Sequence, residues 1–487
     1  MTDPGYSLKV RVPPLEVPDF FASMSDMNKA SLVVLRERGI VSAELAARIG
    51  RAVRDIIQRE DQPGARRSHD YLDFERELLR LAGPEASWLH VGRSRQDMLS
   101  TGVSLWLRAA HLVVFDDLIL VRQKLLELAS RHVETIIPTY THGVQAQPTS
   151  AAHYALAFLA ALERIACRLM QSFGRANRGP LGAGAGTTSA FPLDRERLAA
   201  LLGFDAAIDN AFDANLVAPI DATLELAGIL SALAVDLGQL TQDLHAQFYL
   251  PEPWLTLDPG SMLTGISSMM PQKRNPRVLE LLREHASVVI GAAHSLVLLA
   301  HNTISGMTDV RESVTSVVPL GRVHELLFLY ARTIEAIVID PERSLAEVNR
   351  DYSAMTNLAE YLVQAAGVPF REAHEFASRL TDHGRRHHLS PPRIAYSEAC
   401  RIYQEHAARA LPLSETEFAT AIDPVAIVAT RNGQGGPRRD EVERMLGVTR
   451  RVLADHQQWL ADRRAASAAA RNTLEAAFAN LLQIADD

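Results

Sequence analysis

The chain has 487 residues, of which 47% are hydrophobic and 22% charged, a balance that allows a large buried core. Its formal net charge of −8 argues against a nucleic-acid partner, because phosphate binding needs a basic face. Aromatic residues make up only 6%, whereas Leu, Ala, Glu and Arg are abundant, so helices are favoured over sheets.

The cysteines and the apolar windows bear on where the protein works. Only Cys167 and Cys400 are present, far apart and without a C-x-x-C pair. This pattern argues against a disulfide framework or a structural zinc and predicts a reducing cytoplasm. The first residues are polar and lack the apolar run of a signal peptide. The most apolar window, 288–300, falls short of the roughly 20 residues that span a bilayer, so we expect no membrane contact.

Two short helices are expected first, within 29–51, where Gly39 interrupts the pattern, and within 73–82. Together they predict a small N-terminal helical domain, residues 1–97. The longest patterned stretches follow, and the first would form a buried helix about 50 Å long at 1.5 Å per residue. These stretches are 100–134, 150–177, 222–248 and 277–299.

Several long apolar helices in one region predict a bundle, which we assign to a central domain, residues 98–345. From about residue 346 onward the helices shorten, while proline, glycine and charge become more frequent. This change predicts a third helical domain, residues 346–487, with an alanine-rich helix at 465–479. The expected fold class is all-α, with three helical domains and a long central helical bundle.

A polar motif precedes the first long helix: His90-Val91-Gly92-Arg93-Ser94-Arg95-Gln96-Asp97. Hydroxyl, amide and guanidinium groups at a helix N-terminus can bind an anion, because free backbone N–H groups and the helix dipole both favour negative charge. A plain helix cap with solvated charges explains the same residues equally well.

A histidine motif follows the first long helix: Thr139-Tyr140-Thr141-His142-Gly143-Val144-Gln145-Ala146-Gln147-Pro148. The two prolines at 138 and 148 predict a turn between two long helices. A histidine beside hydroxyls can hydrogen-bond a carboxylate and move a proton near neutral pH. A lone histidine is more often structural, but its polar neighbours here favour a functional role.

Two further patterns favour structural interpretations. Pro180-Leu181-Gly182-Ala183-Gly184-Ala185-Gly186 contains G-x-G-x-G, but no strand precedes it, so we expect a tight backbone approach between helices and not a nucleotide site. The three histidines at 383, 387 and 388 stand among arginines, where a solvated face is favoured over a metal site.

The most informative stretch is Ser267-Ser268-Met269-Met270-Pro271-Gln272-Lys273-Arg274-Asn275-Pro276. It has no helical or strand periodicity and predicts a mobile loop with two hydroxyls, a cation and an amide. Such a set suits chemistry in which negative charge grows on a carboxylate-bearing substrate. An ordinary surface loop is the alternative. A serine hydrolase is also conceivable, but no G-x-S-x-G string surrounds Ser267.

This loop resembles the G-S-S-x-M-P-x-K-x-N-P signature of the fumarase/aspartase superfamily, with every fixed term matched except the first, where Ile266 replaces glycine. Other strings occur in the order that argininosuccinate lyases show, so the chain is similar to that family over most of its length. They are Gly92-Arg93-Ser94-Arg95, Tyr140-Thr141-His142, Ala146-Gln147-Pro148, Pro180-Leu181-Gly182, Asp194-Arg195-Glu196-Arg197 and Gly367-Val368-Pro369-Phe370-Arg371-Glu372-Ala373-His374.

The resemblance implies three helical domains per subunit and a homotetramer joined through the long central helices. Each active site would be built from three subunits. The family's reaction cleaves a C–N or C–O bond and releases fumarate, with no metal or organic cofactor. The partner would be a small molecule that carries a succinyl group.

The family's roles also carry over to matching positions. Ser267 would be the base that removes the Cβ proton, and Lys273 and Asn275 would hold the carboxylate that gains charge. We expect the loop to close over substrate, with Lys273 and loop amides favouring an alkoxide-like serine. His142, polarised by Glu280, would assist proton delivery to the leaving nitrogen. The remaining candidates would bind substrate, and they are Ser94, Arg95, Gln96, Thr141, Gln147, Ser268 and Arg311.

Departures from the family concern the substrate. Gln96 replaces an asparagine, and residues 216–220 replace a Ser-Asp-Arg-Asp string whose arginine contacts substrate. If Arg311 faces the pocket for the guanidinium end, a substrate guanidinium about 4 Å away would meet about 4 kcal/mol of repulsion at an effective dielectric of about 20. An arginine there would suit a carboxylate or nitro group, whereas an inward-facing Asp309 or Glu312 would reverse this argument.

These expectations favour a C–N lyase that eliminates an amine from an N-substituted aspartate, with argininosuccinate or an analogue as substrate. A specialised relative that uses nitrosuccinate or an aminopolycarboxylate is one alternative, and a catalytically silent structural relative is another. The intact Ser267, Lys273, Asn275, His142 and Glu280 argue against the silent relative.

Overall fold

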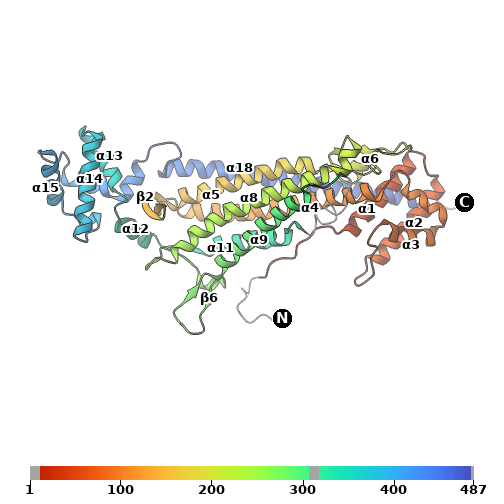
Figure 1. Cartoon of the computed structure of the whole chain (residues 1–487), viewed down its shortest axis with the longest axis horizontal. Helices are drawn as coiled ribbons and strands as arrows, with labels where there is room; N and C mark the ends of the chain where they lie inside the picture. Colours follow the sequence, from red (N-terminus) through yellow and green to blue (C-terminus); the bar gives the residue numbers. More distant parts are fainter. Residues whose placement is uncertain (1–10, 306–316, 484–487) are drawn as a thin grey trace.

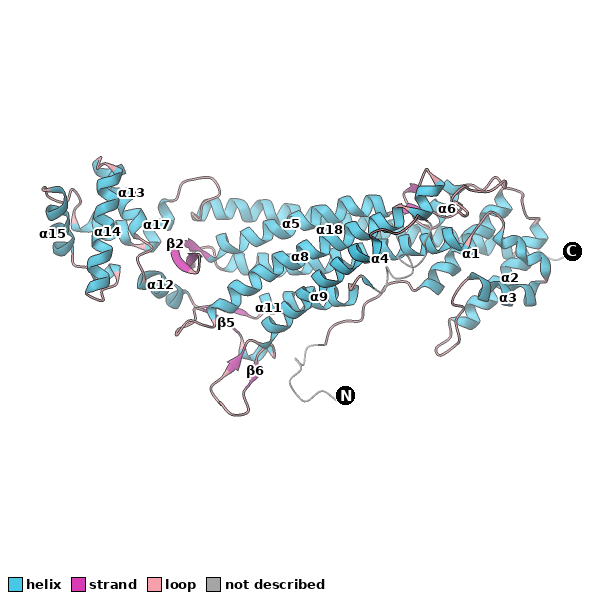
Figure 2. Cartoon of the chain, viewed as in Figure 1, coloured by secondary structure: helices cyan, strands magenta, loops and turns pink. Residues whose placement is uncertain are grey.

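The computed structural model describes residues 11–305 and 317–483, and the candidate positions Asp309, Arg311 and Glu312 lie outside these ranges. A bundle of long helices occupies the centre of the elongated chain, with a smaller helical lobe at each end (Figure 1). The strands are short and lie at the edges of the helices (Figure 2). The all-α prediction is confirmed. None of the described helices is long and apolar enough to cross a membrane.

Three helices form the N-terminal lobe, and each begins at a polar cap. The side chains of Asp19, Ser42 and Asp70 accept hydrogen bonds from backbone N–H groups of the first turns. Gly39 has φ +67° between the first two helices, where a residue with a Cβ would be strained. The elements are α1 (Phe20–Glu37), α2 (Ala43–Glu60), α3 (Tyr71–Ala82) and the 3₁₀ helix η1 (Pro84–His90).

Among the described residues, five long helices between 95 and 335 build the bundle, and the four predicted stretches are helical over nearly their whole length. Their apolar faces meet in one core, in which Leu118, Leu159 and Leu282 are fully buried. The helices are α4 (Arg95–Arg131), α5 (Ala151–Ala176), α8 (Ala218–Gln247), α9 (Arg277–Ala300) and α11 (Leu320–Glu335). α4 packs on α5 and α11, while α8 packs on α5 and α9.

Short elements connect the long helices. The strands are β1 (Ile136–Thr141), β2 (Val144–Ser150), β3 (Arg178–Gly179), β4 (Ala206–Ala207), β5 (Leu255–Leu257), β6 (Gly265–Ile266), β7 (Arg274–Asn275) and β8 (Ile337–Ile339). β3 and β4 pair in parallel, and the pairs β1–β2, β5–β8 and β6–β7 are antiparallel. The short helices are α6 (Arg195–Leu201), α7 (Ala211–Leu216) and η2 (Pro259–Ser261). The β1–β2 and β6–β7 hairpins carry most of the predicted catalytic residues.

The C-terminal lobe has an apolar core of its own, in which Leu358, Phe376 and Tyr403 are fully buried. Gly367 ends one of its helices in the left-handed conformation. The elements are α12 (Pro341–Arg350), α13 (Met355–Ala366), α14 (Phe370–Arg386), η3 (Pro391–Arg393), α15 (Tyr396–Ala407), α16 (Glu415–Ile422) and α17 (Pro424–Thr430).

The last helix, α18 (Arg439–Leu482), leaves this lobe and returns along the bundle to the N-terminal lobe (Figure 1). With 44 residues it is longer than α4, which has 37. The expectation of short helices after residue 346 was wrong here, because alanine and arginine dilute the apolar pattern. Buried leucines nevertheless recur at multiples of seven residues, at positions 446, 453, 460, 474 and 481.

The packing of α18 bears on the domain boundaries. Its Leu446 and Leu453 belong to the core of the bundle, whereas Leu474 and Phe478 belong to the core of the N-terminal lobe. The division at residues 97 and 345 stays a prediction, and α18 is the element that connects the parts it separates.

A buried arginine joins α18 to the centre of the bundle. Arg122 on α4 is fully buried, and its Nη1 donates a hydrogen bond to Nδ1 of His456 on α18 at 2.7 Å. Glu163 on α5 lies 3.7 Å from Nη2 of the same arginine and supplies an opposite charge. Burial, and then Arg122, lower the pKa of His456 from its ordinary value of 6.5. The imidazole therefore accepts as the neutral ring.

Candidate active site

The serine-bearing segment is the loop of the β6–β7 hairpin. The Oγ of Ser267 accepts hydrogen bonds from the backbone N–H of Met269 at 3.3 Å and of Met270 at 3.0 Å. This is the geometry of a serine turn, in which a hydroxyl bonds the backbone that follows it. Two N–H dipoles directed at one oxygen stabilise negative charge on that oxygen. The loop thus fixes the Ser267 oxygen between two N–H donors.

The rest of this loop is exposed. The side chain of Lys273 is exposed and that of Asn275 is half-buried at the start of the chain leading into α9. Met269 is 87% exposed and Ile266 75% exposed, although both are large apolar residues. Apolar side chains at this level of exposure indicate a surface that contacts something beyond the subunit itself.

His142 occupies the tip of the β1–β2 hairpin. Thr141 pairs with Val144, so His142 and Gly143 form a two-residue loop. Their φ angles are +54° and +76°, the combination of a type I′ turn, which holds the histidine in the strained left-handed region. The predicted turn is present, but strands flank it where helices were expected. Tyr140 is 38% and Val144 61% exposed, so the tip presents His142 at the surface.

Glu280 and Gln147 each bond partners other than His142. Glu280 stands in the first turn of α9, where it forms an ion pair with Arg277 of the same helix. Within the described residues, no hydrogen bond joins Glu280 to His142. Gln147 on β2 is exposed, and its backbone N–H and C=O both bond the hydroxyl of Thr139. The predicted pairing of His142 with Glu280 is therefore not formed among the described residues.

The polar motif before α4 forms a complete helix cap. Ser94 Oγ accepts from the N–H of Gln96 at 3.2 Å, and Asp97 accepts from the N–H of Ser94 at 2.8 Å. The other oxygen of Asp97 accepts from the N–H groups of Gly182 at 2.9 Å and Gly184 at 3.0 Å. Burial raises the pKa of Asp97 to about 6, against the opposing effect of these donors. The glycine-rich loop thus closes on a carboxylate, the tight backbone approach that its sequence predicts.

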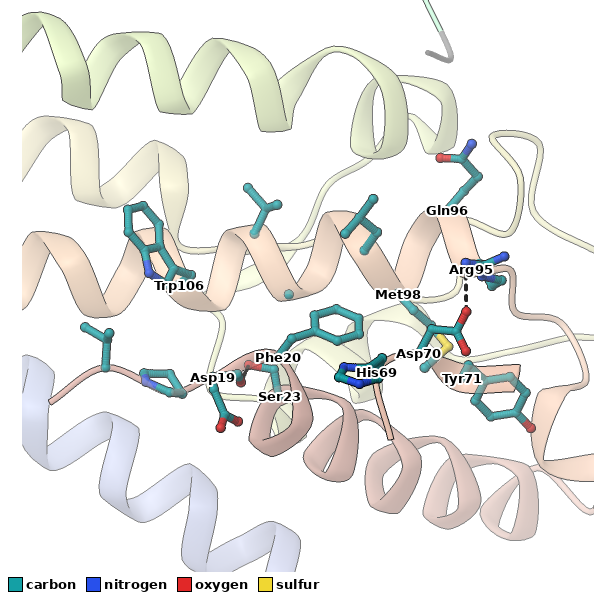
Figure 3. A pocket seen from close by; sticks show the side chains of 15 residues that line it. Asp19, Phe20, Ser23, His69, Asp70, Tyr71, Arg95, Gln96, Met98 and Trp106 are labelled. Atoms are coloured by element: carbon teal, nitrogen blue, oxygen red, sulfur yellow. Dashed lines mark hydrogen bonds and ion pairs between the residues drawn. The ribbon is translucent and has the colours of Figure 1, made fainter. Parts of the chain in front are cut away.

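Arg95 and Gln96 lie at the edge of this cap. Arg95 forms an ion pair with Asp70 at 2.9 Å, and Figure 3 shows the two side chains facing each other. The Oε1 of Gln96 is buried and accepts no hydrogen bond from the described part of the chain. Gln96 therefore keeps an acceptor that a substrate N–H could satisfy, whereas Arg95 is already paired.

The predicted site residues lie in different parts of one subunit. From the cap at Ser94, α4 runs over 37 residues, or about 55 Å, toward the β1–β2 hairpin. The start of α8 packs near α4 through α7, and the serine loop follows the other end of α8. Figure 1 shows β2, β6 and the start of α4 well separated. One subunit therefore does not bring the three groups together.

A cavity beside the cap was not foreseen from the sequence. It has a volume of about 750 Å³ and follows the first three turns of α4, from Arg95 to Trp106 (Figure 3). The sequence held one signal for it, because Gly102 interrupts an otherwise strong helical pattern. Arg311, the remaining predicted substrate-binding residue, lies outside the described residues.

Comparisons with known proteins identify the family of this chain. Residues 39–291 match the family model described as Lyase, and residues 352–429 match the one described as Argininosuccinate lyase C-terminal. The argininosuccinate lyase of Methanosarcina acetivorans is 30% identical over 477 residues, which cover 96% of this chain and 93% of that protein. Argininosuccinate lyase 2 of Agrobacterium fabrum is 32% identical over 442 residues, 88% of this chain and 86% of that protein.

Solved structures show the same fold. EDDS lyase in complex with formate superposes with a TM-score of 0.87 at 26% identity, covering 95% of this chain and 92% of that one. A recombinant class II fumarase from Schistosoma mansoni has a TM-score of 0.67 at 16% identity, covering 86% and 92%. The second likeness concerns the fold alone.

Proposed function

Since this chain belongs to the argininosuccinate lyase family of the fumarase/aspartase superfamily and is a carbon–nitrogen lyase that releases fumarate, we propose that it eliminates an amine from an N-substituted aspartate with Ser267 as the base. The observation that carries this assignment is the pair of backbone N–H groups on the Ser267 oxygen. They favour the charged form that proton abstraction from carbon needs.

The reaction proceeds in two stages. Ser267 takes the proton from Cβ, and the electron pair of that C–H bond moves into the neighbouring carboxylate to give an aci-carboxylate. Lys273 and Asn275 stabilise the added negative charge. The intermediate then collapses to the C=C bond of fumarate as the Cα–N bond breaks. His142, polarised by Glu280, gives a proton to the departing nitrogen.

The high activation barrier for removing a proton from carbon explains why fixed hydrogen-bond donors matter. A C–H bond beside a carboxylate is a very weak acid, so charge stabilisation must supply most of the rate enhancement. One well-placed donor contributes roughly 3–4 kcal/mol in comparable oxyanion sites. Positioned acid–base groups contribute about 10²–10⁴-fold more. Lys273 and Asn275, which would hold the substrate carboxylate, are donors of this kind.

We propose a homotetramer in which each site combines the serine loop, the hairpin tip and the start of α4 from three subunits. The separation of these elements along α4 and α8 supports this assembly. α8 and α9 also expose apolar side chains, namely Val235 at 57%, Val288 at 44%, Val297 at 56% and Leu298 at 76%. Among the described residues of α5, no large apolar side chain is similarly exposed.

Glycines on the same helices support the assembly as well. A Cβ added at Gly228 or Gly238 of α8, or at Gly291 of α9, would meet no atom of the subunit within 4 Å. A glycine inside a helix costs about 1 kcal/mol relative to alanine, and nothing in the subunit requires it there. Close approach of a helix from another copy accounts for these positions.

The substrate is argininosuccinate or an analogue of it. The curated relatives named argininosuccinate lyase favour the first, and the likeness to EDDS lyase favours an aminopolycarboxylate; nitrosuccinate is a further alternative. We place the enzyme in a reducing cytoplasm, because both cysteines are free thiols in the structure.

The test is the appearance of fumarate, followed by its ultraviolet absorbance. Purified enzyme is incubated with argininosuccinate and, separately, with a panel of N-substituted aspartates that includes aminopolycarboxylates. Fumarate release from at least one of them is expected. A silent scaffold would release none from the panel and would join no amine to fumarate in the reverse direction.

A further inference from the structure

The β1–β2 hairpin that carries His142 lies against the C-terminal lobe. Figure 1 shows β2 beside α12, where the bundle meets that lobe. α12 packs on β1, and α17 packs on both strands. At the base of the hairpin, Ile136 shares a small buried apolar cluster with Val348 of α12 and Val428 of α17. The hydroxyl of the fully buried Ser344 donates to the carbonyl of Ile136 at 2.7 Å. The base of the hairpin is therefore fixed to this lobe.

Gln145 anchors the hairpin closer to its tip. Its side-chain Nε2 donates to the backbone carbonyl of Val348 at 2.8 Å and to the hydroxyl of Ser353 at 3.2 Å. The last four carbonyls of a helix have no N–H partner within that helix, and Val348 is among those of α12. The amide of Gln145 therefore bonds an acceptor that no helical N–H uses. A carboxylate in the same place could not donate to this carbonyl, so the bond needs the amide.

Strand geometry connects this anchor to His142. Gln145 pairs with Tyr140, and only one further pair separates it from the two-residue turn that contains His142. Neighbouring side chains on a strand point to opposite faces. Gln145 and Tyr140 therefore face α12, while Val144 faces away from it and is 61% exposed. Burial raises the pKa of Tyr140, and Glu347 of α12 is close enough to raise it further. An anchor this near the turn determines the direction in which the tip points.

The tip itself has no comparable anchor. Within the described part of the chain, the side chains of Thr141, His142 and Val144 make no hydrogen bond. The backbone of His142 has φ +54°, a conformation that persists only where the surrounding structure fixes it. The position of the imidazole therefore depends on the bonds of Gln145 below the turn.

We propose that Gln145 is a positioning residue that sets the place of the His142 imidazole relative to the substrate nitrogen. It acts through His142 and does not touch the substrate itself. The C-terminal lobe thereby controls proton delivery through the end of α12. This inference rests on the proposed function, because it takes His142 as the proton donor. It holds for any amine half of the substrate.

The test replaces the amide of Gln145 and keeps its size. Gln145→Glu removes the N–H donors and places a negative charge at the C-terminal end of α12, where the helix dipole disfavours it. Gln145→Met removes the donors without adding charge, so it provides the test if the charged variant folds poorly. The matched control is Gln62→Glu in the N-terminal lobe. Gln62 donates to the carbonyl of Gln58 at 3.1 Å near the C-terminal end of α2, so the chemical change is the same.

The first measurement is steady-state fumarate release by the full-length enzyme. The substrate is argininosuccinate, or the N-substituted aspartate of the panel that releases fumarate fastest. Both Gln145 variants should lower kcat about tenfold or more, because a shift of a catalytic group by about 1 Å can cost about a hundredfold. KM should change less than about twofold, since Gln145 does not bind substrate. Gln62→Glu should keep the turnover of the unchanged protein.

A solvent isotope effect separates positioning from a general loss of folded enzyme. Ser267 removes a hydrogen bound to carbon, which D₂O does not replace, whereas the proton that His142 delivers exchanges with solvent. Slower proton delivery in the Gln145 variants should therefore raise the ratio of kcat in H₂O to kcat in D₂O. A smaller fraction of active enzyme would lower kcat in both solvents and leave this ratio unchanged.

Hydrogen–deuterium exchange of the backbone amides, followed by mass spectrometry, tests the anchor without any substrate. Gln145→Glu should speed exchange in the peptide 139–147 and leave α2 unchanged, because only the hairpin loses a bond to α12. Gln62→Glu should leave exchange in 139–147 as it is in the unchanged protein.

The outcomes separate this role of Gln145 from the proposed function. If substrate is cleaved but both Gln145 variants keep a normal kcat, or if kcat falls and the isotope ratio stays the same, Gln145 does not position the donor and the lyase remains. Unchanged exchange in 139–147 would overturn the anchor itself. If the unchanged protein cleaves no N-substituted aspartate, the proposed function fails, and the role of Gln145 in proton delivery fails with it.

Discussion

The bundle differs from the two hairpins that carry predicted catalytic residues in how far its apolar side chains are buried. In the bundle, Leu118 and Leu159 are fully buried and the helices satisfy each other within one subunit. In the hairpins, Met269 and Ile266 are exposed by 87% and 75%, and His142 stands at an exposed tip. The apolar core of the bundle is therefore covered within one chain, whereas the hairpins leave large apolar side chains uncovered. Substitutions in the hairpins should change activity with little effect on folding, and substitutions in the bundle should do the reverse.

The largest expected effect comes from the serine loop. Ser267→Ala removes the base and the oxygen that the amides of Met269 and Met270 stabilise, so kcat should fall about 10³-fold or more. The melting temperature should stay within about 1 °C, because the side chain lies outside the apolar core. Ser268→Ala, one residue further on, should reduce kcat by less than about tenfold. Near-normal turnover in Ser267→Ala would remove the base assignment.

Mixing subunits tests whether the two hairpins act across copies. Ser267→Ala and His142→Asn should each be inactive, but co-expressed subunits should regain activity at about one quarter of the sites, where both groups are intact by random mixing. The control is a mixture of Ser267→Ala with Lys273→Ala. Both changes lie in one loop, so no site regains a complete loop. Equal recovery in the two mixtures would contradict shared sites.

The turn that carries His142 should tolerate only residues that accept a left-handed backbone. Gly143→Val should strain the turn by about 1–2 kcal/mol and, by shifting the imidazole, reduce kcat about tenfold or more. Gly143→Asn should reduce kcat by less than about threefold, because asparagine adopts this left-handed conformation readily. Steady-state kinetics of the two variants makes the comparison. Similar losses in both would indicate that space, and not backbone strain, limits position 143.

Acid should weaken the bundle through His456. Its pKa is lowered in the folded state, by burial and by Arg122, so the folded protein resists protonation that the unfolded chain accepts. This contribution to stability is present above about pH 6.5 and is lost as the pH falls below that value, by at most about 1.4 kcal/mol per pH unit. Thermal melts at pH 7 and pH 5 should show a smaller fall in melting temperature for His456→Asn than for the unchanged protein. If the melting temperature of this variant falls as much as that of the unchanged protein, other groups cause the acid sensitivity.

The smallest expected effect is on stability, when alanine replaces either of two helical glycines that have open space around them. Gly174→Ala on α5 should stabilise the protein by about 0.5–1 kcal/mol, because alanine is the better helix former and this face stays free. Gly228→Ala on α8 should instead weaken the proposed tetramer, seen as a loss of specific activity on dilution. If both substitutions stabilise equally, α8 is not an interface.

Local patterns explain which parts the sequence predicted. The leucines of α8 recur at three- and four-residue spacing, so periodicity alone located that helix. Only 465–479 of α18 was predicted, because polar residues separate its buried leucines and hide the continuity of the helix. The β1–β2 hairpin escaped as well, since its two-residue turn is His142-Gly143 and lacks the usual asparagine or aspartate in the first position.

The candidate site was likewise predicted only in part. The composition of 267–276 indicated the loop and its chemistry, and the resemblance supplied roles for single residues. The distance between Ser94 and His142, however, depends on how α4 crosses the bundle, which no local pattern encodes. The cavity at Trp106 likewise depends on Phe20, a residue far away in the sequence that packs against Gly102.

The course of α18 has a mechanical consequence. At 1.5 Å per residue this helix is a rod about 66 Å long, fixed by Leu446 in the bundle and by Phe478 in the N-terminal lobe. Both anchors belong to one continuous helix. Rotation of the N-terminal lobe against the bundle would therefore have to bend α18 or withdraw one of these side chains from its core.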